Sequence, residues 1–112
     1  MWLFTKVGFF SVTKSRYNDE ELQIRARVKE DLENLKRYLP SLGSIVEMED
    51  ADYRYRIYVS VGDFKKVVDK IIDDIDYDNF KNKVAKEQGW KRSWLYGNVW
   101  SIMKDAEEHL SE

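Results

Sequence analysis

Apolar and polar positions predict two strands in the first quarter of the chain. Residues 2–13 are rich in aromatic and β-branched side chains, which favour a half-buried strand, and Gly8 marks a bend in it. Residues 15–21 are polar and form a loop. Residues 22–28 then alternate apolar and polar side chains with a period of two, which is typical of a strand with one buried face.

The middle of the chain predicts a helix followed by two more strands. Apolar residues recur at helical spacing through residues 28–39, and Pro40 ends the predicted helix because it disfavours helical geometry in the residue before it. Residues 45–48 and 53–61 read as strands joined by the acidic turn 49–52.

Three helices are predicted for the rest of the chain. Asp63 is the expected N-cap of a helix that continues to Ile75, and Asp78 the expected N-cap of a shorter one. The shorter helix ends at Gly89, because glycine readily adopts the left-handed conformation found just after helix ends. The last helix covers residues 93–109.

The core is expected to form where apolar helix faces meet the sheet. Ile71 and Val99 are central in two such faces, and we predict that both are nearly fully buried. Large aromatic side chains supply much of the remaining core. They are Trp2, Phe4, Phe9, Phe10, Tyr53, Tyr55, Phe64, Phe80 and Trp100.

The predicted order ββαββααα places the chain in the α+β class. We expect a mainly antiparallel four-stranded sheet covered on one face by helices. Residues 22–75 supply most of a ferredoxin-like unit, and the first strand can take the place of its missing last strand in a permuted arrangement. With 112 residues and no linker-like segment, residues 1–112 are expected to form a single α+β domain.

Composition excludes several classes of protein. The chain has no cysteine, which excludes disulfide bonds, a thiolate nucleophile and metal sites with cysteine ligands. Its 19 basic and 21 acidic residues give a net charge of −2, which argues against a strongly basic nucleic-acid binder. Neither a signal-peptide pattern nor a long apolar run is visible, so we expect no membrane partner and a cytoplasmic location.

Short local motifs are spread over nearly the whole chain. They lie at residues 2–5, 8–11, 25–27, 31–32, 52–56, 74–81, 96 and 99–100. In these motifs the chain resembles a family of small uncharacterised bacterial proteins. The resemblance implies one complete domain, and because the family has no assigned activity, cofactor or partner, it brings no catalytic residue.

Arginines on the second and fourth predicted strands form the sharpest candidate site. Alternation places the arginines on one face of the sheet and Ile24 and Ile57 on the other, and the arginine face is the one that helices are expected to leave uncovered. The proposed binding set is Arg25, Arg27, Arg54, Arg56 and Tyr58. Guanidinium groups bind phosphate or carboxylate and stack on planar rings. We therefore expect a non-catalytic binding domain for a phosphate-bearing ligand, with single-stranded nucleic acid as one such ligand.

Three alternatives stay open. First, the arginines can simply pair with nearby carboxylates such as Glu47 or Asp52. Second, the chain can be a protein-interaction or self-association module that uses a sheet edge or Trp90 and Trp94. Third, it can be a metal-independent ribonuclease in which arginines stabilise the transition state and a tyrosine transfers protons.

No catalytic residue, metal or cofactor is predicted. Asp73, Asp74, Asp76 and Asp78 cluster near a helix end but lack the frame of an EF-hand calcium loop. His109 is the sole histidine and lies close to the C-terminus, where a cationic side chain suits the end of a helix. The sequence therefore favours binding over catalysis.

Overall fold

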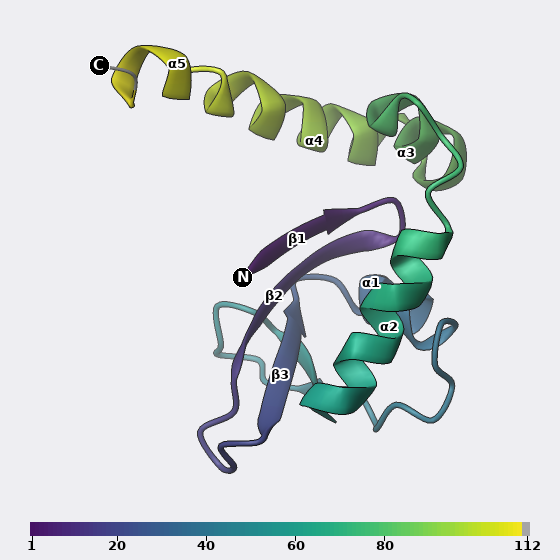
Figure 1. The fold of residues 1–112 in the computed structure, drawn as a ribbon. Coiled ribbons are helices and arrows are strands. Elements are labelled where there is room, and N and C mark those ends of the chain that lie inside the picture. Colours follow the sequence, from purple (N-terminus) through teal and green to yellow (C-terminus); the bar gives the residue numbers. More distant parts are fainter. Residues whose placement is uncertain (111–112) are drawn as a thin grey trace. The chain divides into compact units, whose positions relative to one another are not determined.

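The computed structural model describes residues 1–110. Contacts divide the chain into two compact units, Met1–Asp76 and Tyr77–Glu112. The first unit contains a sheet with two helices, and the second contains helices alone (Figure 1). The single domain predicted for residues 1–112 stays a prediction.

The first unit is built on a five-stranded antiparallel sheet. Its strands are β1 (Trp2–Thr5), β2 (Gly8–Lys14), β3 (Glu21–Ala26), β4 (Val46–Glu47) and β5 (Tyr55–Ser60). Their spatial order is β1-β2-β3-β5-β4, and every neighbouring pair is antiparallel. β1, β2 and β3 lie side by side in Figure 1. The α+β class is thereby confirmed, with five strands instead of four; the permuted ferredoxin-like arrangement stays a prediction.

The extra strand arises because residues 2–13 form a hairpin and not one bent strand. The chain reverses at Lys6 and Val7, and Thr5 pairs with Gly8. Thr5 Oγ1 accepts hydrogen bonds from the N–H groups of Val7 at 3.2 Å and Gly8 at 3.1 Å. A Cβ atom on Gly8 would lie 2.5 Å from Cγ of the buried Asp31, so glycine is required here by close approach.

Two helices, α1 (Lys29–Lys36) and α2 (Val61–Asp73), pack against one face of this sheet. The N-cap of α2 is Ser60 and not Asp63: Ser60 Oγ accepts the Asp63 N–H at 3.1 Å, which corrects the predicted start of the helix. The buried core contains Phe10, Val12, Ile24, Ala26, Leu32, Leu35, Leu42, Ile57, Val59, Phe64 and Val67.

The second unit contains α3 (Phe80–Gln88), α4 (Trp90–Met103) and the short α5 (Ala106–His109). Asn79 and not Asp78 is the N-cap of α3, since its Oδ1 accepts the Asn82 N–H at 3.0 Å. Gly89 ends this helix as predicted, but its φ of 92° and ψ of 170° lie outside the left-handed helical region that we expected. The last helix predicted over residues 93–109 begins at Trp90 and is interrupted after Met103.

Several side chains assigned to the core are more exposed than predicted. Ile71 and Val99 are only partly buried, while Trp2 and Trp100 are 69% and 60% exposed. Within α4 only Tyr96 is buried, because α3 packs against one side of that helix. No helix in residues 1–110 is long and apolar enough to cross a membrane.

Candidate anion-binding site

Arg25 on β3 and Arg56 on β5 lie directly opposite each other. The adjacent pair, Ile24 and Ile57, is fully buried in the core beneath the helices. Since successive side chains of a strand point to opposite faces, the two arginines project from the other face, as the alternation predicts.

A single row of paired residues crosses the whole sheet through these arginines. From β1 to β4 it contains Trp2, Ser11, Arg25, Arg56 and Val46, each directly opposite its neighbours. Directly opposed residues lie on the same face, so the exposed indole of Trp2 shares the face of the arginine pair. Trp2 was missed as a site residue because the hairpin that places it here was not predicted.

The guanidinium groups of Arg25 and Arg56 use only some of their hydrogen-bond donors. Arg25 Nη2 donates to Ser11 Oγ at 2.6 Å, and Arg56 donates to Gln23 Oε1 and to the Tyr53 carbonyl oxygen, both at 3.0 Å. The Nε atoms of Arg25 and Arg56 are buried and have no hydrogen-bond partner in residues 1–110. Within the same residues, neither arginine forms a salt bridge.

Tyr53 lies on this arginine face, not in the main core where alternation placed it. β5 begins only at Tyr55, so the period-two pattern does not extend back to Tyr53. The Tyr53 ring centroid is 4.7 Å from Cζ of Arg25 and 4.5 Å from Cζ of Arg27, and 6.4 Å from the ring of Phe9. These cation–π contacts hold the buried tyrosine against the arginines.

The other two predicted arginines, Arg27 and Arg54, are neutralised by carboxylates. Arg27 Nη1 lies 3.2 Å from Asp52 Oδ1. Arg54 Nη2 lies 3.1 Å from Glu47 and 3.5 Å from Glu49. The hydrogen bond and negative charge of Glu47 raise the pKa of Arg54 above its usual value. The four arginines therefore divide into an uncompensated pair and two exposed ion pairs.

Tyr58, the last predicted site residue, lies in the next row of the same face. It is opposite Gln23, whose Nε2 donates to Thr13 Oγ1 at 2.9 Å. Its ring centroid lies 5.8 Å from that of Tyr17, which is 70% exposed. Tyr17 belongs to the polar loop 15–21, where no sequence pattern indicated a site residue.

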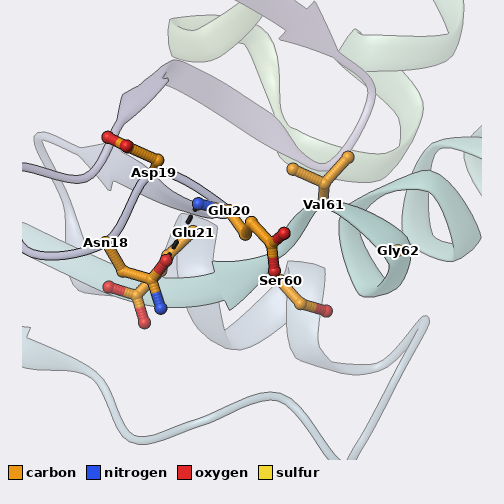
Figure 2. Close-up of a pocket in the computed structure, with 7 residues that line it drawn as sticks. All are labelled: Asn18, Asp19, Glu20, Glu21, Ser60, Val61 and Gly62. Carbon is orange, nitrogen blue, oxygen red and sulfur yellow. Dashed lines mark hydrogen bonds between the residues drawn. The ribbon is translucent and has the colours of Figure 1, made fainter.

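A hollow of about 520 Å³ at one end of β3 and β5 is acidic (Figure 2). Its lining comes from the loop before β3 and from the start of α2: Asn18, Asp19, Glu20, Glu21, Ser60, Val61 and Gly62. No group of three or more acidic, histidine or cysteine residues in residues 1–110 is arranged to hold a metal. The carboxylates of Asp19, Glu20 and Glu21 in this hollow repel an anion.

Trp90 and Trp94, the predicted interface residues, are 70% and 60% exposed on α4. Together with Lys91 and Leu95 they line a hollow of about 360 Å³. Exposed tryptophans of this kind are typical of protein interfaces.

No family model, curated protein or solved structure matches the chain. Membership of a family of small bacterial proteins therefore stays a prediction, and function has to be inferred from the geometry of these residues.

Proposed function

We propose that the chain is a non-catalytic binding domain that holds a phosphate-bearing ligand on the Arg25–Arg56 face of its sheet. The supporting observation is that these two cations lie opposite each other with no carboxylate partner in residues 1–110. Like charges in directly opposed positions destabilise a sheet. An anion bound over the pair removes that repulsion and accepts charge-assisted hydrogen bonds.

Aromatic side chains beside the pair favour single-stranded nucleic acid as the ligand. Trp2 lies two strands from Arg25, about 10 Å away in the sheet. Tyr58 lies in the adjacent row, and the ring of Tyr17 from the loop before β3 contacts it. Bases of a single strand stack on exposed aromatic rings while its phosphates bind arginine.

Acidic groups at both ends of the strands limit the affinity of this face. Glu47, Glu49 and Asp52 lie near one end, and Asp19 and Glu20 lie near the other. A phosphate chain therefore binds across the strands, along the row from Trp2 to Arg56, and we expect modest affinity that falls as salt rises.

Nuclear magnetic resonance tests this proposal directly. The Nε–H groups of Arg25 and Arg56 are buried, so their signals report on the state of the two guanidinium groups without a direct bond to the ligand. A short single-stranded oligonucleotide whose phosphate binds these groups should shift both signals at low salt. The exposed Arg37, the C-cap residue after α1, is the internal control, and its signal should not move. Shifts of Arg37 as large as those of the pair, or no shift at all, would contradict the proposal.

The protein-interaction alternative is favoured by one separate observation, the exposure of Trp90 and Trp94.

The ribonuclease alternative is tested by incubating RNA with the protein in EDTA. Intact RNA that nevertheless binds supports a binding domain, whereas cleavage in EDTA supports the enzyme. The cytoplasmic location stays a prediction.

A further inference from the structure

Helix α4 has apolar side chains around most of its circumference but buries only Tyr96. Its exposed apolar side chains, between 52% and 70% exposed, are Trp90, Trp94, Leu95, Trp100, Ile102 and Met103. A helix that is apolar on nearly all sides is normally surrounded by other protein or by lipid. α4 is too short to span a membrane, so a protein partner is the expected cover.

One exposed stripe of this helix has the pattern of a helix–helix seam. At 100° per residue, six exposed residues fall within about 100° of the helix circumference. They are Lys91, Trp94, Leu95, Asn98, Ile102 and Asp105. Asp105 belongs to the stripe because Lys104 and Asp105 keep right-handed helical angles beyond Met103.

The stripe is complementary to itself when one copy runs in the opposite direction. Lys91 and Asp105 lie seven residues on either side of Asn98, and Trp94 and Ile102 lie four residues on either side. Two antiparallel copies that cross at Asn98 place Lys91 of each against Asp105 of the other. Between these ends, Trp94 of each copy meets Ile102 of the other.

We propose that α4 pairs with α4 of a second copy of this chain, antiparallel, with a two-fold axis at Asn98. Such an interface is isologous, so each contact occurs twice. The hollow of about 360 Å³ beside Trp94 and Leu95 receives Ile102 of the second copy. Asn98 meets its own counterpart on the axis, where a polar residue in an apolar seam fixes the register.

Charge selects the antiparallel direction. The start of α4 is basic, with Lys91 and Arg92, whereas the segment after it is acidic, with Asp105, Glu107 and Glu108. A parallel pair would bring lysine to lysine and aspartate to aspartate, and an antiparallel pair brings opposite charges together at both ends. This surface lies in the second unit, so its failure would leave the binding proposal for the sheet untouched.

Charge reversal tests the pairing in the full-length chain. Analytical ultracentrifugation at protein concentrations up to about 0.5 mM should show a monomer–dimer equilibrium for the unchanged chain. Lys91→Glu alone and Asp105→Lys alone should each weaken dimerisation about fivefold or more at low salt. A mixture of the two variants should restore it, because each heterodimer has two attractive contacts. Both positions are exposed, and circular dichroism verifies that the variants fold.

A cysteine cross-link tests the position of the axis. Since the chain has no cysteine, Asn98→Cys introduces a single thiol, which should form a disulfide-linked dimer under mild oxidation. Lys86→Cys, an exposed position on α3, is the matched control and should cross-link far more slowly. A chain that stays monomeric throughout, a mixture that restores nothing, or equal cross-linking at both positions would overturn the proposal.

Discussion

Arg25 and Arg56 face each other across β3 and β5, and each leaves its Nε without an acceptor in residues 1–110. Ser11, Gln23 and the Tyr53 carbonyl group fix the orientation of the two side chains but do not neutralise their charge. The proposed anion site costs stability in the free protein, because two cations are held together in the absence of a ligand.

Arg25→Gln should therefore leave the stability of the free domain almost unchanged. Relief of the repulsion with Arg56 offsets the lost cation–π contact with Tyr53 and the lost hydrogen bond to Ser11, so we expect a change in unfolding free energy within about 0.5 kcal/mol. Ile24→Ala, at the next position of the same strand, should cost about 2–5 kcal/mol. Urea denaturation measures both. A loss above about 1.5 kcal/mol for Arg25→Gln would mean that Arg25 is structural.

Gly8→Ala should destabilise the first unit by about 1–3 kcal/mol. The new Cβ would lie 2.5 Å from Asp31 Cγ, and Asp31 is buried and accepts the Phe9 N–H at 3.1 Å. Gly62→Ala is the matched control, because a Cβ there has nothing within 4 Å; it should stabilise the helix by up to about 1 kcal/mol. Equal effects of the two substitutions in thermal or urea unfolding would contradict the close packing of Gly8 against Asp31.

Replacing both members of the Arg54–Glu47 ion pair should leave the affinity for a single-stranded oligonucleotide within about twofold of that of the unchanged chain. Both side chains are exposed, and the Arg54 charge is already balanced. Arg54→Gln and Glu47→Gln are made together so that the net charge of the chain does not change, and Glu49, the second carboxylate partner of Arg54 at 3.5 Å, stays in place. A loss as large as that of Arg56→Gln in the same titration would place Arg54 in the binding site.

Tyr58→Ala should weaken single-strand binding by about 1–3 kcal/mol if a base stacks on this ring. Tyr58→Phe keeps the ring and should retain most of the affinity. Isothermal titration calorimetry with a short oligonucleotide distinguishes the two variants. Equal affinities for the alanine and phenylalanine variants would exclude stacking on Tyr58.

Alternation predicted the arginine pair well because it depends only on local backbone geometry. Within β3 and β5, Ile24 and Ile57 face the core and Arg25 and Arg56 face away from it, as period two requires. The same rule was wrong for Tyr53, which lies before the start of β5. The loop before β5 determines that the strand begins at Tyr55, and the alternation of apolar and polar residues does not reveal where this loop ends.

Other features depend on contacts that a sequence pattern cannot contain. The hairpin at Lys6 and Val7 lacks typical turn residues, and its glycine requirement arises from Asp31, which is 23 residues away from Gly8 in the sequence. In α4, helical periodicity indicates which side chains share a face but not whether another element covers that face. Trp100 was therefore assigned to the core although it is exposed.

The most direct test of the binding proposal is fluorescence anisotropy of a labelled single-stranded oligonucleotide with two charge-matched double variants. Arg25→Gln/Arg56→Gln removes the pair, and Arg37→Gln/Lys65→Gln removes two exposed cations, one just after α1 and one on α2. At low salt the first variant should bind at least about tenfold more weakly than the unchanged chain and lose about 1.4 from the slope of log affinity against log salt. The second should bind within about threefold of it. Equal losses in the two variants, or no binding by the unchanged chain, would contradict an anion site at Arg25 and Arg56.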